Sequence, residues 1–181
     1  MEGVFIVSAK LNTVYIGLGS NLQQPLQQVM RAVDALRGTA DLNQVRCSSL
    51  YRSLPLGPQD QPDFINAVVE AQTTLSPHAL LAVLQALEND FGRERGGERW
   101  GPRVLDLDVL LHADTVISSE ALVVPHPQLH RRAFVLRPLA ELDENLSIPG
   151  LGSLQCLLSK LSPNDLAALE IVQPCSTSLL S

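Results

Sequence analysis

The segment from Val104 to His112 restricts the possible folds of this chain more than any other part of the sequence. Apolar residues alternate there with Asp106 and Asp108, which is the period-two pattern of a strand with one face in a core. The apolar residues expected to share that buried face are Leu105, Leu107, Val109 and Leu111. The two carboxylates then lie side by side on the other face, where they repel each other and are costly to bury. A sheet that contains this strand therefore has to keep that face accessible.

Two interpretations of the aspartate pair are open. Carboxylate oxygens suit Mg²⁺, which also takes water and substrate phosphate oxygens as ligands. The alternative is that Asp106 and Asp108 are two solvated side chains on an open sheet face, because short Asp-x-Asp matches are common. The residues that precede the strand favour the first interpretation.

The loop before the strand is rich in arginine. Only two of the 13 basic residues are lysines, and four of the eleven arginines lie within eleven positions. Those four are Arg93, Arg95, Arg99 and Arg103. A guanidinium binds phosphate through paired hydrogen bonds and keeps its charge, and the neighbouring glycines permit loop closure. The alternative is that Glu94 and Glu98 pair with these arginines on a solvated loop, where such pairs contribute little.

Trp100 is the only tryptophan and lies in the same polar loop. Large aromatic side chains usually enter a core, so its position suggests a stacking surface or an anchor for a lid. Together with the arginines and the aspartates, it predicts a phosphate or nucleotide substrate held by arginines and magnesium.

The remaining apolar periodicities predict one α+β domain. Strands are expected over 14–19, 45–53 and 64–74, and helices over 24–37 and 77–91. With the aspartate-containing strand the order becomes β-α-β-β-α-β, the arrangement called ferredoxin-like.

Beyond that core we expect added C-terminal helices, including one over 153–160, and a short extra hairpin. The expected domain spans residues 13–160. Residues 1–12 are then an N-terminal extension, and residues 161–181 a C-terminal segment with a frayed tail.

The composition excludes several classes of protein. The formal net charge of −6 argues against general binding of duplex nucleic acid. No apolar run approaches the ~20 residues of a membrane span, and the N-terminus does not resemble a signal peptide. The three cysteines lack ligand spacing, which predicts reduced thiols in the cytoplasm. We expect a cytoplasmic monomer with small-molecule partners and with neither nucleic acid nor membrane as a partner.

Two further segments contain residues typical of phosphate sites. Gly17 and Gly19 fit neither the P-loop nor the dinucleotide pattern, so they are interpreted as a tight turn from strand to helix. His126 and His130 lie beside a pair of arginines and could form a second phosphate-facing edge. The alternative is that both histidines are simply hydrogen-bonded within the fold.

Four stretches, taken together and in order, resemble those of the 6-hydroxymethyl-7,8-dihydropterin pyrophosphokinases, enzymes of folate biosynthesis. The stretches are Tyr15–Asn21, Pro55–Asn66, Arg99–Asp108 and the segment from Pro125 to Phe134. The resemblance covers about residues 13–142. It implies transfer of the β,γ-pyrophosphate of ATP to the hydroxymethyl group of the pterin, with release of AMP.

The resemblance also implies roles for individual residues. Asp106 and Asp108 would hold two Mg²⁺ ions, one bridging the α- and β-phosphates and the other the β- and γ-phosphates. Arg93 and Arg103 would be the catalytic arginines that neutralise phosphate charge. The implied pterin-binding residues are Ser53, Leu54, Leu56, Phe64, Asn66 and Phe134, with the two phenylalanines on either side of the ring. The implied ATP-binding residues are Gln85, Glu88, Trp100, Val109, Leu122, His126 and Arg132.

This chain departs from the family pattern at two places. Gly96 and Gly97 replace a basic residue that some members carry, so one phosphate contact is expected to be absent. Ala121 and Val123 stand where some members have polar contacts to the nucleotide. Both departures bear on nucleotide affinity more than on activity.

Two rival functions are consistent with parts of the pattern. A palm-like nucleotidyl transferase or cyclase also places two acidic residues on a ferredoxin-like sheet, but it releases pyrophosphate. A ligand-binding regulatory domain of the same fold is the non-enzymatic alternative, and it leaves the aspartate pair and the clustered arginines without a purpose.

Overall fold

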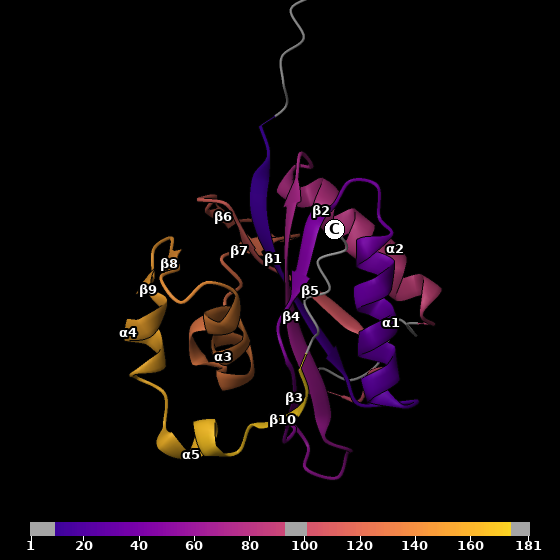
Figure 1. Ribbon diagram of the computed structural model, residues 1–181, viewed down its shortest axis with the longest axis vertical. Helices are drawn as coiled ribbons and strands as arrows, with labels where there is room; N and C mark the ends of the chain where they lie inside the picture. The colour runs from indigo at the N-terminus through magenta and orange to yellow at the C-terminus, as the bar shows by residue number, and fades with distance from the viewer. Residues whose placement is uncertain (1–9, 93–100, 175–181) are drawn as a thin grey trace, which may run out of the picture.

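The computed structural model describes residues 10–92 and 101–174. Figure 1 shows three layers: a central sheet, helices α1 (Pro25–Arg37) and α2 (Pro77–Asp90) on one side, and α3 (Ala133–Leu142) and α4 (Leu154–Leu158) on the other. The short helices η1 (Leu129–Arg131) and α5 (Pro163–Ala167) lie in the connections. No helix within the described ranges has the length and apolar character needed to span a bilayer.

The central sheet is antiparallel throughout, with the strand order β10-β3-β4-β1-β5, and β2 also pairs with β4. Its strands are β1 (Asn12–Ser20), β2 (Asn43–Cys47), β3 (Leu50–Ser53), β4 (Phe64–Thr73), β5 (Asp106–His112) and β10 (Glu170–Gln173). β1 is an interior strand, because it pairs with β4 along one edge and with β5 along the other. The prediction of a mixed domain with an antiparallel sheet and several helices is confirmed.

The first core lies between the sheet and the two long helices. Helix α2 begins where the sequence predicts, because the hydroxyl of Ser76 accepts a hydrogen bond from the main-chain N–H of Ala79 at 3.2 Å. Leu80 and Leu84, one turn apart on that helix, are fully buried against the sheet, as is Leu36 of α1.

The second core lies on the opposite face, under α3 and α4. It contains Leu136 and Leu139 of α3, Leu154 of α4, and Tyr15 and Val68 from the sheet. α3 does not reach along the whole sheet, and the part of this face beyond its N-terminal end holds the pocket described below.

The expected strand over 45–53 is two strands, β2 and β3, separated at Ser48. The main-chain N–H of Ser48 donates to the carbonyl of Val68 at 2.9 Å, and its hydroxyl accepts from the N–H of Val68 at 3.0 Å. Because these two hydrogen bonds use both polar groups of Val68, the chain bends at Ser48 and the ladder restarts at β3.

The expectation that Leu111 shares a face with the other apolar residues of its strand is wrong. Tyr15 pairs with Leu111, whereas the next residue, Ile16, pairs with Val109. Leu110 is therefore the extra residue of a β-bulge, which interrupts the alternation of the strand. As a result Leu110 and Leu111 both pack in the second core.

Two short hairpins and a final strand complete the fold. One hairpin is formed by β6 (Ile117–Ser118) and β7 (Val123–Val124), and a second by β8 (Ser147–Ile148) and β9 (Gly152–Ser153), whereas the sequence predicts one short extra hairpin, without a position. β10 is not among the strands expected from the sequence; it pairs with β3 and so covers what would otherwise be a sheet edge.

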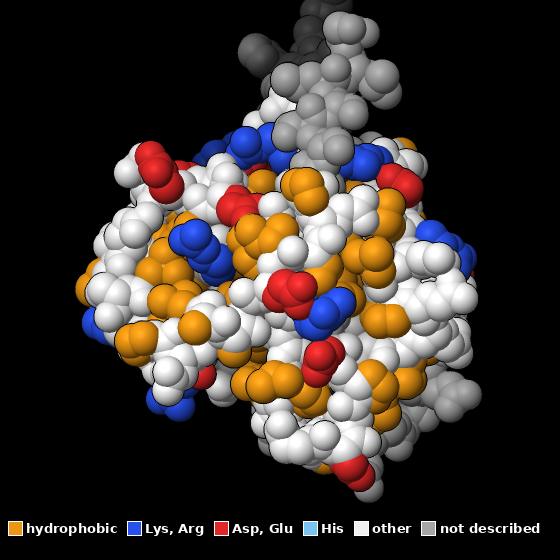
Figure 2. Space-filling model, turned by 60° about the horizontal axis from the view of Figure 1, so that its bottom comes forward, with side chains coloured by type: hydrophobic (Ala, Val, Ile, Leu, Met, Phe, Trp, Pro, Cys, Tyr) orange, Lys and Arg blue, Asp and Glu red, His pale blue; other side chains and the backbone are white. Residues whose placement is uncertain are grey.

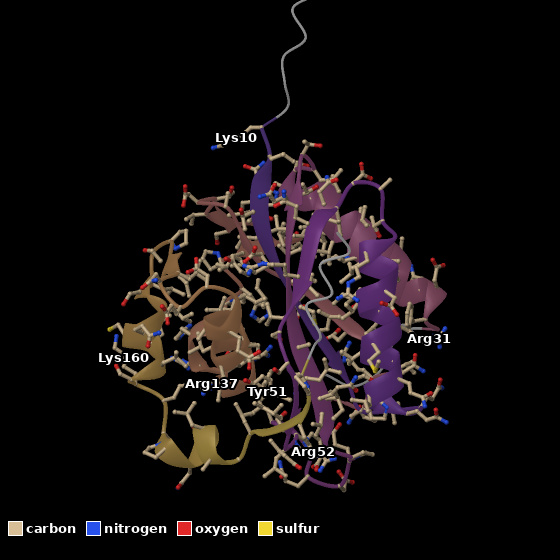
Figure 3. All side chains as sticks on the ribbon, in the orientation of Figure 1. Lys10, Arg31, Tyr51, Arg52, Arg137 and Lys160 are labelled. Atoms are coloured by element: carbon tan, nitrogen blue, oxygen red, sulfur yellow. The ribbon has the colours of Figure 1, made fainter. Side chains whose placement is uncertain are left out.

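β3 is also attached to its surroundings by side chains that Figure 3 labels. Arg52 forms an ion pair of 2.8 Å with Glu170 of β10, and the Tyr51 hydroxyl donates to Glu141 of α3.

On the face turned toward the viewer in Figure 2, hydrophobic side chains form patches with acidic and basic side chains between them. Among the large hydrophobic side chains that line the pocket described below, Leu54 and Leu56 are the most exposed, at 59% and 62%.

A core leucine and the exposed ion pair should differ strongly in their effect on stability. Leu36→Ala, which empties a fully buried site, should lower the free energy of unfolding by about 2–5 kcal/mol. Glu170→Gln should lower it by about 1 kcal/mol or less, because both partners of the ion pair are about half exposed. Chemical denaturation measures both values, and equal losses in the two variants would contradict this packing.

Candidate active site

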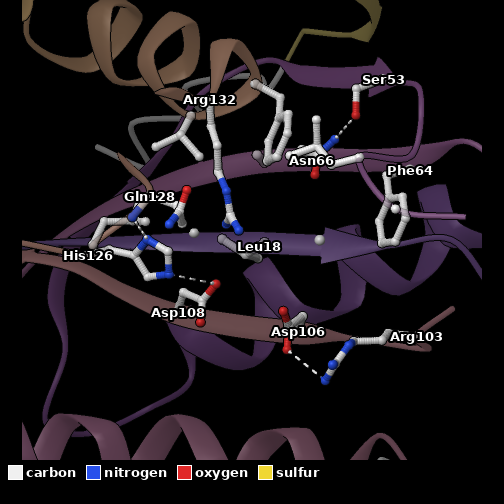
Figure 4. A pocket seen from close by; sticks show the side chains of 18 of the residues that line it. Leu18, Ser53, Phe64, Asn66, Arg103, Asp106, Asp108, His126, Gln128 and Arg132 are labelled. Atoms are coloured by element: carbon white, nitrogen blue, oxygen red, sulfur yellow. Dashed lines mark hydrogen bonds and ion pairs between the residues drawn. The ribbon is translucent and has the colours of Figure 1, made fainter. Parts of the chain in front are cut away.

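A pocket of about 400 Å³ opens on the α3 side of the sheet, beyond the N-terminal end of that helix. Its floor is formed by β1, β4 and β5, and its far wall by the segment that leads from His126 into α3. Figure 4 places Ser53, Asn66 and Phe64 toward one end and His126 and Gln128 toward the other, with the two aspartates along β5 between them. A pocket of this size suits one or two small molecules.

Both aspartates of the predicted pair line this pocket. Asp106 and Asp108 point away from the first core, as the alternation predicts, and their side chains are 34% and 40% exposed. Their direct partners on the neighbouring strand are Gly19 and Gly17. Since neither partner has a side chain, the carboxylates face open space on the β1 side.

The interpretation of these glycines as a turn is wrong. Gly17 and Gly19 lie within β1 and line the pocket. The turn into α1 comes later, at Gln23 and Gln24, which both have left-handed backbone conformations with φ of 50° and 65°. A local pattern of two glycines before a polar pair does not distinguish these cases, because only the pairing with β5 reveals what the glycines face.

Two arginines stand near the carboxylates. Arg132 reaches down toward the aspartates from the far wall (Figure 4), and the Nη1 atom of Arg103 lies 3.6 Å from Oδ1 of Asp106. Burial lowers the pKa of the Arg132 guanidinium, while the charges of Asp108 and Asp106 act to raise it. A guanidinium stays protonated at any physiological pH, so the aspartates face a permanent positive charge.

The imidazole of His126 is neutral, and its surroundings determine which ring nitrogen carries the proton. Its Nδ1 atom accepts a hydrogen bond from the main-chain N–H of Gln128 at 3.2 Å, so the proton of the neutral ring lies on Nε2. Nε2 lies 3.9 Å from Oδ2 of Asp108, which is too long for a hydrogen bond. Burial, followed by the charge of Arg132, lowers the pKa of His126 to about 4.

All the residues implied for pterin binding line the same pocket: Ser53, Leu54, Leu56, Phe64, Asn66 and Phe134. Asn66 is 5% exposed, and its amide donates to the hydroxyl of Ser53 at 2.9 Å. That hydrogen bond fixes the orientation of both polar groups at the end of the pocket where Phe64 lies. The guanidinium of Arg132 lies 5.7 Å from the centre of the Phe134 ring, which links this end to the charged part of the pocket.

Four of the residues implied for ATP binding do not line this pocket. Gln85 is exposed on α2, while Val109 and Leu122 are buried in the first core. Glu88 is 1% exposed, and its carboxylate accepts a hydrogen bond from the main-chain N–H of Leu107 at 2.8 Å. Glu88 therefore supports the strand that carries the aspartates from behind. Arg93 and Trp100 lie outside the described residues.

Asn21 has a structural role that the sequence analysis did not identify. Its amide donates to the side-chain oxygen of Gln61 and to the carbonyl of Pro62, both at 3.0 Å. Its side-chain oxygen accepts from the main-chain N–H of Arg103 at 2.8 Å, and its own main-chain N–H donates to the carbonyl of Arg103 at 3.0 Å. Asn21 is 1% exposed, so it joins the loop before β4 to the segment before β5 from a buried position. A polar residue directly after a buried strand was the available signal.

The donor set at the aspartates suits a hydrated divalent cation. Mg²⁺ is bound in proteins through one or two carboxylates, with water and phosphate oxygens as its other ligands. Asp106 and Asp108 supply two carboxylates that are accessible from the pocket. Within residues 10–92 and 101–174, no three His, Cys, Asp or Glu side chains are grouped to hold an ion. A cation here would therefore need oxygens from water and from a phosphate-bearing substrate.

Comparison with known proteins identifies the family. The model of the family described as 7,8-dihydro-6-hydroxymethylpterin-pyrophosphokinase (HPPK) matches residues 15–144. The chain is 48% identical over 137 residues to a 2-amino-4-hydroxy-6-hydroxymethyldihydropteridine pyrophosphokinase of Haemophilus influenzae, covering 76% of this chain and 85% of that protein. It is 47% identical over 139 residues to the protein of the same name from Pseudomonas aeruginosa, covering 77% of this chain and 85% of that protein.

A solved structure shows the same fold. The crystal structure of wild-type Plasmodium falciparum HPPK-DHPS with pteroate superimposes with a TM-score of 0.65 at 14% identity. It covers 83% of this chain, and the chain spans 42% of that longer protein. The family model and the named relatives define the class as the pyrophosphokinases, which are kinase-type transferases. The chain belongs to the 7,8-dihydro-6-hydroxymethylpterin-pyrophosphokinase family.

The ionisation of His126 gives a direct test of this geometry in the protein without metal or nucleotide. We expect its imidazole to stay neutral, with the proton on Nε2, until the pH falls to about 4. Because this pKa is below the value of about 6.5 in the unfolded chain, the unfolded state binds more protons between these values. The contribution of His126 to stability is therefore complete above pH 6.5 and is lost as the pH falls toward 4.

Nitrogen-15 spectra of the histidine rings measure both the tautomer and the midpoint, and His126→Gln assigns the signal. The same variant should lose less stability between pH 6.5 and 4 than the unaltered protein does. A midpoint near 6.5, or a neutral ring protonated on Nδ1, would contradict the arrangement.

Proposed function

We propose that this chain transfers the β,γ-pyrophosphate of ATP to the hydroxymethyl group of 6-hydroxymethyl-7,8-dihydropterin and releases AMP. The observation that carries the proposal is that one pocket combines two chemically different ends. Asp106, Asp108 and Arg132 suit a metal-bound polyphosphate, and the amide of Asn66, with two phenylalanines lining the same pocket, suits a flat polar heterocycle. The names of the relatives agree with these two substrates.

The reaction requires positioning more than covalent catalysis. The hydroxyl oxygen of the pterin forms a bond to the β-phosphorus and gives up its proton, while the bond from that phosphorus to the oxygen of the α-phosphate breaks. Phosphoryl transfers of this type depend on alignment and on neutralisation of the phosphate charge. The chain's contribution is then to hold two substrates at a fixed separation and to present positive charge.

Asp106 and Asp108, together with the phosphate oxygens, would hold two Mg²⁺ ions per active site. When bound, Mg²⁺ supplies Lewis-acid stabilisation of the charge on the transferred phosphates. Arg132, directed at the same region, would bind phosphate oxygens from the opposite wall. His126 would donate a hydrogen bond from Nε2, since the contact from Gln128 holds the proton on that atom.

The pterin would lie between Phe64 and Phe134. Offset stacking contributes about 0.5–1.5 kcal/mol beyond the burial of area. Asn66, Ser53 and the main chain at Leu54 and Leu56 would pair with the polar edge of the ring. Because unpaired buried polar groups are costly, this edge is expected to determine specificity.

The remaining ATP contacts are also proposals. Gln85, Glu88 and Trp100 would contact the nucleotide from α2 and the loop that follows it, and Arg93 and Arg103 would neutralise phosphate charge. Val109 and Leu122 would contact the adenine. Their side chains are buried in the first core, so such contacts would use main-chain atoms.

We also infer a ferredoxin-like core formed by β1, β3, β4 and β5 with α1 and α2. Its support is the strand order β5-β1-β4-β3, in which every neighbouring pair is antiparallel.

Phosphorus NMR of a mixture of enzyme, Mg²⁺, ATP and the pterin tests the function. AMP should form only when the pterin is present. Asp108→Asn should lower the rate by at least about 100-fold, because the metal-bound phosphates lose a charged ligand worth several kcal/mol. Asp114→Asn, an exposed acid just beyond the same strand, should stay within about twofold and serves as the control.

Formation of ADP in place of AMP would contradict the proposal. Release of pyrophosphate would instead favour the nucleotidyl transferase or cyclase class.

A further inference from the structure

One row of residues crosses the pocket floor from β4 to β5. Gly19 of β1 pairs directly with Asn66 of β4 on one side and with Asp106 of β5 on the other. Directly paired residues in antiparallel strands face the same side of a sheet, so all three positions face the pocket. All three line it.

The spacing across this row follows from the sheet. Neighbouring strands lie about 4.8 Å apart, so Asn66 and Asp106 are separated by about 10 Å with one residue between them. That residue has no side chain. No side chain therefore rises from the pocket floor midway between two groups. One is the amide of Asn66, proposed to hydrogen-bond the pterin, and the other is the carboxylate of Asp106, proposed to hold the metal-bound phosphates.

The transfer requires its two reacting atoms to come together at one place. A hydroxyl oxygen and a β-phosphorus in a reactive arrangement lie about 3–3.5 Å apart. With the pterin anchored at Asn66 and the phosphates anchored at Asp106, the available meeting point lies above Gly19.

We propose that Gly19 is a positioning residue, because the absence of a side chain there keeps open the space in which the two substrates meet. The inference rests on the proposed function, and it states what one residue, Gly19, contributes to the transfer between the two substrates. This role differs from substrate binding. A side chain at position 19 would obstruct the space between the two substrates, here called the junction, and would leave in place the residues proposed to bind each substrate.

The backbone at Gly19 accepts a side chain without strain. Its φ lies outside the left-handed region that favours glycine, and an added Cβ would meet only Oδ1 of Asn66, at 3.5 Å, an ordinary van der Waals contact. The glycine is therefore not required by the fold at this position, and the bare floor itself is what a substitution would change.

Gly17 provides a positional comparison on the same strand. It pairs with Val68 and Asp108, so it has a carboxylate on one side but no polar pterin-binding residue on the other. An added Cβ there would meet the buried side chain of Leu110 at 3.3 Å, closer than an ordinary van der Waals contact, so thermal unfolding of this variant shows whether that side chain moves to admit it. A methyl group at position 17 is thus next to the phosphate region but away from the junction.

The test compares Gly19→Ala, Gly17→Ala and Gly38→Ala, the last at the C-terminal end of α1 and away from the pocket. Calorimetry measures the binding of Mg²⁺ with a non-hydrolysable ATP analogue, of the pterin, and of both together, and AMP formation gives kcat and KM. Thermal unfolding monitors the fold.

Gly19→Ala should bind each substrate alone within about threefold of the unaltered protein. Its kcat should fall about 100-fold, the loss expected when reacting groups are displaced by about 1 Å. Its affinity for the second substrate, measured with the first already bound, should also fall. Gly17→Ala should lose less kcat than Gly19→Ala, and Gly38→Ala should be unchanged.

Retention of kcat in Gly19→Ala would overturn the proposal, and so would loss of affinity for one substrate measured alone. Equal losses in the Gly17 and Gly19 variants would also overturn it, because the effect would not then depend on the junction. Unfolding of Gly19→Ala would overturn it as well, because the backbone at position 19 would then not accept a methyl group. Failure of the unaltered protein to form AMP would instead contradict the proposed function.

Discussion

The register of β1 between its two neighbours is the constraint on which the rest of the site depends. β1 pairs with β4 over its whole length and with β5 over most of it, so one strand aligns the two sets of pocket residues. This alignment sets Gly17 and Gly19 opposite Asp108 and Asp106 and leaves the carboxylates accessible. A shift of one residue would turn the side chain of Ile16 toward the pocket and bring the glycines into the first core.

Local sequence patterns predicted those parts of the fold that depend on nearest neighbours along the chain. Ser76 marks the beginning of α2, and the alternation around Asp106 and Asp108 correctly predicts their common face. What the sequence could not reveal depends on pairing between distant segments. The bulge at Leu110, the glycine floor and the strand β10 all arise from register with another strand, which no local periodicity encodes. The residues implied for pterin binding come from resemblance to a family, and all six line one pocket.

Local charge differs from the charge of the whole chain. The formal net charge of the chain is −6, yet the pocket places the half-buried guanidinium of Arg132 near two carboxylates, beside a histidine that burial keeps neutral. This arrangement is consistent with the proposed polyphosphate substrate, for which the aspartates would bind the metal and Arg132 would bind phosphate oxygens. Asn21 is buried and joins the loop at Gln61 and Pro62 to the main chain of Arg103 through hydrogen bonds.

The central claim is that the aspartates opposite the glycines of β1 hold the metal-bound phosphates of the nucleotide. Electron paramagnetic resonance with Mn²⁺ in place of Mg²⁺ tests it most directly, in the presence of a non-hydrolysable ATP analogue and the pterin. Two bound Mn²⁺ ions per chain, with magnetic coupling between them, are expected for the unaltered protein, and both the number and the coupling should fall in Asp106→Asn. An unchanged number of bound ions and an unchanged spectrum in that variant would contradict the claim.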